Sequence, residues 1–194
     1  MQNPVELLAI MKMFLGFDKN DVVRMEDLKS VLVPYTAEMV QKFYASLEQL
    51  EDCRKTIATR PEQRETLQNI LVTWYAEIFS GNYGSEYAER RWNIVLMLLK
   101  DEIPFYCVIG AIGTVYLFSA RKLNEDVVTF SGDVLPYVES LSKLLQIDLS
   151  FIEQAYEQSM SSAIMLDSGI SQTMFHRIVE SRFTFLLDEI DQKS

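Results

Sequence analysis

The chain has 194 residues, of which 48% are hydrophobic and 24% are charged, and its formal net charge at pH 7 is −10. This length and hydrophobic content allow one globular domain with an extension. The acidic balance excludes nucleic acid as an expected partner, because phosphate binding needs clustered Lys and Arg, and the sequence holds no such cluster. Only 7 Gly and 5 Pro interrupt long helical patterns, which predicts an all-α fold.

The first two predicted helices are short and are separated by helix-ending residues. One begins at Pro4 and ends at Gly16, since proline fits the first turn of a helix and glycine fits the position after its end. Asn20 or Asp21 is expected to cap the second helix, because short polar side chains accept hydrogen bonds from free amides there. This helix breaks at Pro34.

Two amphipathic helices follow in the predicted order. The first runs from Thr36 to Leu50, with its apolar residues on one face. The second begins with a capping box in which Thr59 is the cap and Glu62 lies three residues later. It ends at Ser80-Gly81, where a short turn begins.

The centre of the chain predicts two helices joined at a proline. Ser85 opens the first, and the second runs from Pro104 to Leu123. The residues from 103 to 120 carry no charge, and 18 residues is the lower limit for crossing a membrane. Tyr, Thr and Ser side chains interrupt this run, and its neighbours are amphipathic, so we expect a buried helix instead.

The last third of the chain predicts one long helix and one shorter helix. The long helix runs from Val134 to Met160. Ser168-Gly169 interrupts the helical pattern before a final amphipathic helix between Ile170 and Ile190. The apolar stripe of this last helix needs a partner in the same chain or in a second one.

Several motifs together resemble globin-coupled sensors and protoglobins. In that family, Glu-Arg-Arg precedes the histidine that binds haem iron, and an aliphatic-Pro pair and an aliphatic-Gly-Ala follow it. The matching segments are Glu89-Arg90-Arg91, Ile103-Pro104, Ile109-Gly110-Ala111, Phe43-Tyr44 and the Leu-Leu-x-x-Asp-aliphatic pattern at residues 144–149. The position of the histidine is occupied by Leu98. The chain therefore resembles the haem-less members, such as the non-haem globin domains of stressosome and sporulation-inhibitory proteins.

The resemblance implies a globin-like helical sandwich with an extra helix at the N-terminus and a helical extension at the C-terminus. The implied domains are an N-terminal helix (1–16), a globin-like sensor domain (17–160) and a C-terminal extension or linker (161–194). It further implies a homodimer that regulates a signalling output domain or a partner protein.

We expect no haem and no metal, because the side chain of Leu98 has no lone pair for iron. Protein interiors are close-packed, so the space that haem would fill should shrink to an apolar pocket for a fatty acid or another apolar small molecule. The expected pocket residues are Tyr44, Leu71, Trp74, Tyr75, Ile94, Leu98 and Tyr106. Tyr44 has two interpretations: a half-buried tyrosine whose hydroxyl reaches the surface, or a polar group at the head of the pocket.

The dimer interface is expected on the last two long helices of the globin-like part. Gly110 and Gly113 remove side-chain bulk, which permits another helix to approach closely, either in the same chain or in a second copy. The family resemblance favours the second copy. The expected interface residues are Gly110, Gly113, Leu117, Leu145 and Ile152.

The remaining polar residues predict no catalytic site. The chain has one histidine, His176, which we expect on a surface or an interface. The group of Glu86, Glu89, Arg90 and Arg91 could bind an anion, but we expect it to form a solvated, salt-bridged helix face. Cys53 and Cys107 are expected to be reduced thiols of a cytoplasmic protein.

Taken together, these features predict a non-enzymatic, haem-free sensory domain. Two alternatives are a haem-based gas sensor with an unusual iron ligand and a ligand-free dimerisation module.

Overall fold

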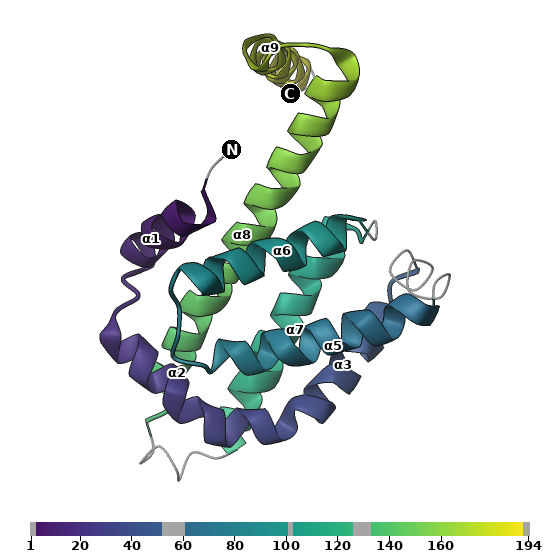
Figure 1. Cartoon of the computed structure of the whole chain (residues 1–194). Coiled ribbons are helices and arrows are strands. Elements are labelled where there is room, and N and C mark those ends of the chain that lie inside the picture. The colour runs from purple at the N-terminus through teal and green to yellow at the C-terminus, as the bar shows by residue number, and fades with distance from the viewer. Residues whose placement is uncertain (1–2, 52–60, 101–102, 126–132, 192–194) are drawn as a thin grey trace. The chain divides into compact units, whose positions relative to one another are not determined.

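A computed structural model describes residues 3–51, 61–100, 103–125 and 133–191. In chain order the helices are α1 (Pro4–Leu15), α2 (Lys19–Leu32), the short 3₁₀ helix η1 (Val33–Tyr35), α3 (Thr36–Glu48), α5 (Pro61–Ile78), α6 (Ser85–Lys100), α7 (Phe105–Glu125), α8 (Leu135–Ser168) and α9 (Gln172–Asp191) (Figure 1). The described ranges contain no strand, so the predicted all-α fold is confirmed.

The ends of the first helices follow from local chemistry. The Asn3 side chain accepts a hydrogen bond from the Val5 amide at 2.9 Å, and Gly16 ends α1 with a φ of 61°, a left-handed conformation that favours glycine. The predicted cap of α2 is wrong by two or three residues. Asp18 caps this helix, and its backbone amide donates to Asp21, which completes a capping box. The predicted cap at Thr59 lies outside the described residues.

The chain divides into two compact units, residues 1–155 and residues 156–194. The first unit contains the helices from α1 to α7 and the first part of α8. The second contains the rest of α8 and α9. The sequence placed this boundary five residues later, after Met160, and assigned the N-terminal helix to a separate segment. In the first unit α1 packs against α6, and Leu7 and Leu8 are buried.

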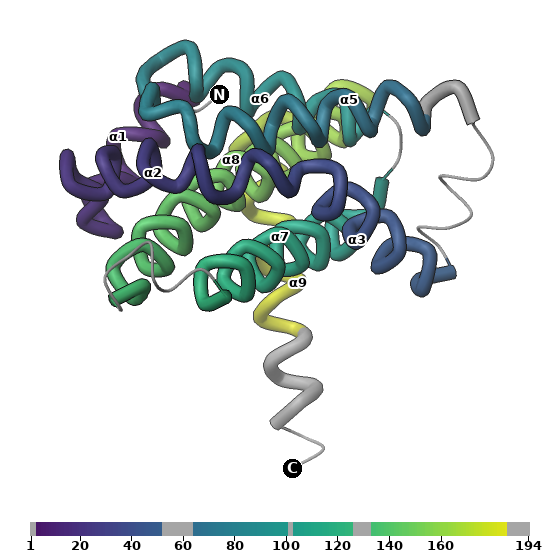
Figure 2. Tube along the Cα trace, turned by 90° about the horizontal axis from the view of Figure 1, so that it is seen from below, coloured from purple at the N-terminus to yellow at the C-terminus, as the bar shows by residue number. Residues whose placement is uncertain are grey.

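Within the first unit, α7 lies on the side opposite α5 and α6 (Figure 2). The helix α3 packs against both α5 and α7, and α2 also contacts α7. The core between them is formed by large apolar and aromatic side chains without solvent exposure, among them Met25, Leu28, Tyr75, Phe79 and Phe151. Burial of this kind is the main contribution to the stability of the fold.

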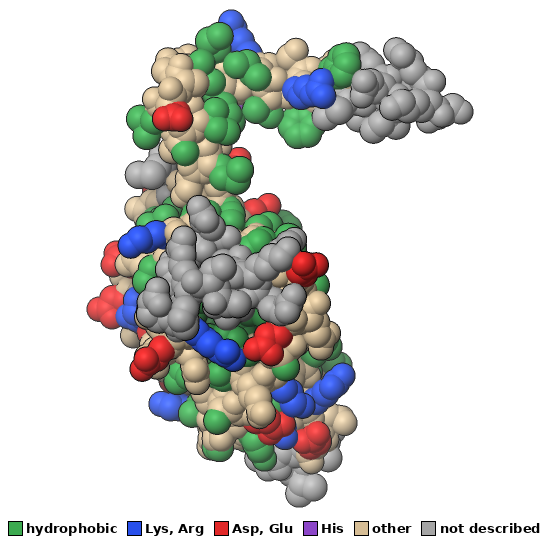
Figure 3. Space-filling model, turned by 90° about the vertical axis from the view of Figure 1, so that its right-hand side faces the viewer, with side chains coloured by type: hydrophobic (Ala, Val, Ile, Leu, Met, Phe, Trp, Pro, Cys, Tyr) green, Lys and Arg blue, Asp and Glu red, His purple; other side chains and the backbone are tan. Residues whose placement is uncertain are grey.

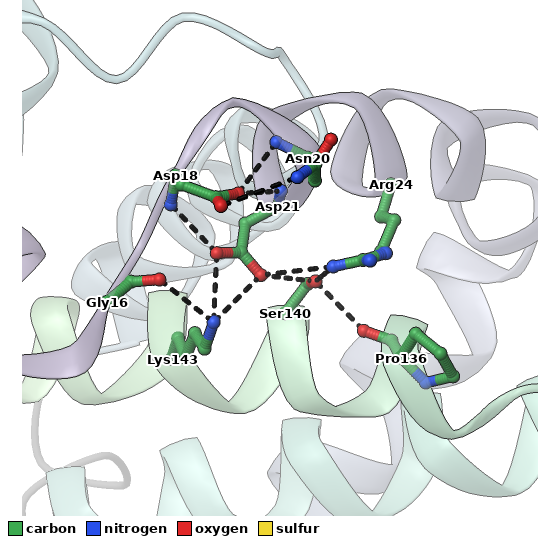
Figure 4. A network of polar contacts seen from close by, with 8 residues as sticks. All are labelled: Gly16, Asp18, Asn20, Asp21, Arg24, Pro136, Ser140 and Lys143. Carbon is green, nitrogen blue, oxygen red and sulfur yellow. Dashed lines mark hydrogen bonds and ion pairs between the residues drawn. The ribbon is translucent and has the colours of Figure 1, made fainter.

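A buried carboxylate joins the start of α2 to α8 (Figure 4). Ser140 Oγ donates to Asp21 Oδ1 at 2.6 Å, and Lys143 Nζ lies 3.0 Å from Asp21 Oδ2. Lys143 also donates to the Gly16 carbonyl at 3.0 Å. Burial alone would raise the pKa of Asp21, but hydrogen bonds from Ser140, the Asp18 amide and Lys143 lower it below its usual value. The carboxylate is therefore ionised at neutral pH.

The second unit exposes much of its hydrophobic surface (Figure 3). The exposed apolar side chains include Met160, Ile164 and Leu166 from the end of α8 and Met174, Ile178, Phe183 and Phe185 from α9. His176 is exposed on α9, at the surface where the sequence placed it. None of the described helices has the length and apolar character needed to cross a membrane.

Candidate functional site

An apolar cavity of about 100 Å³ lies in the core of the first unit. Its walls come from α3, α5, α6, α7 and α8 and from Ile103, which precedes α7. The lining residues that the sequence did not predict include Leu47, Leu67, Ile70, Val108, Ala111 and Ile152. Aliphatic side chains dominate this lining, so the cavity offers a ligand dispersion contacts and few hydrogen bonds.

Five of the seven predicted pocket residues line this cavity. They are Tyr44, Leu71, Trp74, Ile94 and Leu98.

Tyr75 and Tyr106 lie elsewhere. Tyr75 is fully buried, its hydroxyl is 3.3 Å from Ser119 Oγ, and burial raises its pKa to about 12. Tyr106 is 49% exposed on α7. Successive helical residues turn by about 100°, so Tyr75 cannot share the direction of Trp74, which points into the cavity.

The hydroxyl of Tyr44 is already bound within the chain. It donates to the Arg64 carbonyl at 3.3 Å, and the Arg64 guanidinium lies over the tyrosine ring at 5.3 Å from its centroid. Tyr44 is buried rather than half-buried. The residue lines the cavity chiefly with its ring, and a ligand that used its hydroxyl would have to share it with the Arg64 carbonyl.

The lining does not suit the iron of a haem. Leu98 has no donor atom, and the polar atoms on the walls are already engaged. The Tyr44 hydroxyl binds Arg64, and the Trp74 indole nitrogen donates to Asp148. Among the described residues, no group of three or more His, Cys, Asp or Glu side chains is placed to hold a metal ion.

Cys107 also lines the cavity, and it is disulfide-bonded rather than a free thiol. The expectation of a reduced thiol is therefore wrong for this residue. Cys53 lies outside the described residues. No sequence spacing signals this bond, because the pairing of cysteines depends on how the chain folds.

A buried polar cluster adjoins the cavity through Trp74. Asp148 Oδ2 accepts a hydrogen bond from Trp74 Nε1 at 2.7 Å, and Asp148 Oδ1 accepts one from the Tyr87 hydroxyl at 2.5 Å. Arg91 Nε forms an ion pair with Asp148 Oδ2 at 3.0 Å. Asp148 is 1% exposed and Arg91 is 2% exposed. We call these four residues, Trp74, Tyr87, Arg91 and Asp148, the Asp148 cluster.

Further contacts from neighbouring groups hold Arg91 in the Asp148 cluster. Arg91 Nη1 lies 2.7 Å from Glu77 Oε2, its Nη2 donates to the Trp74 carbonyl, and its guanidinium lies 4.3 Å from the centroid of the Tyr87 ring. Burial raises the pKa of the Asp148 carboxyl, and the charge of Arg91 and the hydrogen bonds offset part of this rise. Because its members come from three helices, the Asp148 cluster joins α5, α6 and α8.

The predicted solvated helix face is wrong for Arg91. Arg90 does lie on that face, with its side chain 42% exposed and paired to Glu77 and Glu86. Arg91 is the next residue along α6, and the turn of the helix between the two residues directs its side chain into the core. A sequence signal for this existed, since Tyr87, Arg91 and Val95 follow a four-residue spacing on the buried face of α6.

The predicted dimer residues fall into two groups. Gly110 is exposed, Gly113 is partly exposed, and Leu117 is 55% exposed on α7. A Cβ atom added at either glycine would meet nothing within 4 Å. Leu145 and Ile152, in contrast, are buried in the core of the same chain, and Ile152 lines the cavity. The outward face of α7 is therefore the part of the predicted interface that is open to a partner.

Comparisons with known proteins agree with this arrangement of helices. No curated protein matches the chain. The globin domain of the Geobacter sulfurreducens globin-coupled sensor matches in structure with a TM-score of 0.65 and 17% sequence identity, over 76% of this chain and 96% of that one. This likeness confirms the predicted globin-like fold.

A model of the protoglobin family matches residues 6–162, which is more than half of the chain. The match includes both the cavity and the Asp148 cluster. The chain therefore belongs to the protoglobin family.

Proposed function

We propose that this chain is a haem-free sensory domain that binds a small apolar ligand and passes its state through a dimer to a signalling output. The observation that carries the proposal is that Leu98 lines an apolar cavity; the family resemblance puts the iron-binding histidine at this position. In this proposal the domain is not an enzyme, and the output is a further domain or a partner protein.

The size of the cavity supports a compact ligand. Sites for drug-sized molecules enclose roughly 300–1,000 Å³, whereas this cavity measures about 100 Å³. Engineered cavities of roughly 150 Å³ lined by Leu, Ile and Phe bind benzene or xenon. A short acyl chain or a small hydrocarbon suits the space, and a long fatty acid would require the walls to separate.

Replacing Leu71 with Trp is expected to abolish binding of an apolar probe, because the larger side chain occupies the cavity that Leu71 lines. At ten times its Kd, benzene stabilises a binding protein by about 1.4 kcal/mol. This should raise the melting temperature of the unmodified chain by roughly 3–6 °C. The Leu71→Trp variant should show no rise, as measured by differential scanning calorimetry.

The control is Leu71→Met, a volume-conserving change that cores tolerate and that should keep the rise. Decanoate is the second probe, and it tests whether the walls open for an acyl chain. If neither probe stabilises the unmodified chain, a ligand-free dimerisation module replaces the present proposal.

Replacing Gly113 with Leu is expected to weaken the dimer by at least tenfold in Kd, because a branched side chain would fill the space above α7 that a second copy needs. The free chain has room for this side chain, so its stability should change little. Analytical ultracentrifugation measures the association. The matched control is Ala9→Leu on α1, an exposed position far from α7 in the sequence. A monomeric unmodified chain at micromolar concentration would contradict the dimer.

We also propose a cytoplasmic location. The disulfide at Cys107 counts against it, because disulfides are rare in reducing compartments. The test is to trap free thiols in intact cells and then to unfold the protein and count its labelled cysteines. Two labelled cysteines would support the cytoplasmic location, and a retained disulfide would contradict it.

A further inference from the structure

We propose that the hydrogen bond between Trp74 and Asp148 is the link through which the cavity's occupant sets the position of α8. This inference rests on the proposed ligand binding and names the path by which that binding is transmitted.

Trp74 belongs to both the cavity wall and the Asp148 cluster. Its indole lines the cavity, and its Nε1 donates to Asp148 Oδ2 at 2.7 Å in a buried environment. On α8, Ile152 lies four residues after Asp148 and also lines the cavity. The same face of α8 therefore meets the cavity directly through Ile152 and through the polar contact with Trp74.

The indole cannot shift freely without a change in α8. A hydrogen bond to a charged group is stronger than one between neutral groups, and leaving its partner unsatisfied in a dry site is costly. Tyr87 and Arg91 of α6 hold the same carboxylate. A ligand that displaces the indole therefore moves the Asp148 cluster together or breaks one of its contacts.

The helix α8 is suited to carry such a displacement. It runs without interruption from Leu135 to Ser168, so it begins in the first unit and continues into the second. The Asp148 carboxylate is attached near its middle. Because a ligand shifts an equilibrium only by its difference in affinity for two states, the occupant must favour one arrangement of Trp74 over the other.

The matched variants for a test are Trp74→Phe and Tyr87→Phe. Each removes one neutral donor to Asp148, but only Trp74 lines the cavity. Because Phe is smaller than Trp, Ile94→Val serves as a further control that enlarges the cavity without touching Asp148. Benzene binding to each variant is measured by calorimetry, so that loss of binding is seen separately from loss of transmission.

The readout is amide hydrogen exchange of residues 156–168 in α8, which follow the residues that line the cavity, relative to residues 107–112 in the cavity wall. In the unmodified chain, Tyr87→Phe and Ile94→Val, saturating benzene should slow exchange in α8 by about tenfold, a change typical of coupling between two sites. In Trp74→Phe the cavity wall should still be protected, while α8 changes by less than about twofold. Equal slowing of α8 in Trp74→Phe, or its loss in Tyr87→Phe as well, would overturn the inference.

A second measurement uses a variant in which no residue of the cavity wall is replaced. The chain has two tryptophans, so Trp92→Phe leaves the indole proton of Trp74 as a single NMR signal. Benzene should shift this signal, because the hydrogen bond to Asp148 changes length. An unchanged signal at saturation would overturn the inference with ligand binding intact, whereas absence of benzene binding to the unmodified chain would overturn the proposed function as well.

Discussion

Replacing Arg91 with Met is expected to lower the free energy of unfolding by about 3–5 kcal/mol, the usual cost of removing one partner from a buried ion pair. Arg91 is 2% exposed and contacts both Asp148 and Glu77. Without the guanidinium, the Asp148 carboxylate stays buried with only the donors Trp74 and Tyr87. Because domains are stable by only about 5–15 kcal/mol, this loss is a large part of the total. Urea unfolding followed by circular dichroism at pH 7 measures it.

The neighbouring arginine provides the matched control. Arg90 lies on the same helix and also pairs with Glu77, but its side chain is 42% exposed. Arg90→Met should therefore cost only about 0–1 kcal/mol, as is usual for exposed pairs. The double variant Arg91→Met with Asp148→Asn should lose less unfolding free energy than the two single variants lose together, because it leaves no uncompensated charge at position 148. Equal costs at Arg90 and Arg91 would contradict the buried role of Arg91.

The unmodified chain is expected to bind no stoichiometric haem when it is mixed with hemin. Leu98 supplies no lone pair, the Tyr44 hydroxyl and the Trp74 nitrogen are engaged, and the cavity of about 100 Å³ is smaller than any site for a drug-sized molecule. An absorption titration checks this. A sharp Soret band that saturates at one haem per chain would contradict the prediction and favour a gas sensor with an unusual iron ligand.

Leu98→His is the informative companion variant. It places an imidazole on α6 at the position where the family resemblance puts the iron ligand. Haem binding by this variant alone would mean that the missing donor decides the outcome. Failure of both proteins to bind haem would mean that the small size of the cavity, about 100 Å³, decides it.

Much of the fold was predictable from sequence because helix ends and helix faces are local features. Pro4 and Gly16 bound α1, and α6 begins at Ser85, as predicted. The family resemblance extended this to the arrangement of the helices, since its motifs lie at matching intervals along the chain. Five of the predicted pocket residues line the cavity for the same reason: a helical face and a known fold together place them.

The remaining features depended on contacts between distant parts of the chain. Asp148 lies 57 residues from Arg91, and their pairing inside the core follows from how α6 and α8 pack rather than from either motif alone. The bond at Cys107 and the burial of Leu145 depend on packing in the same way.

The volume of the cavity was likewise set by tertiary structure. The family resemblance put Leu98 at the position expected for an iron ligand, but it did not indicate how far the surrounding helices close around this residue. That distance depends on the whole set of side chains packed between α3, α5, α6, α7 and α8. The sequence by itself therefore determined most helices and the family. Only the tertiary structure decided which ionisable residues meet in the core and how much space remains beside them, because both depend on the simultaneous packing of residues far apart in the chain.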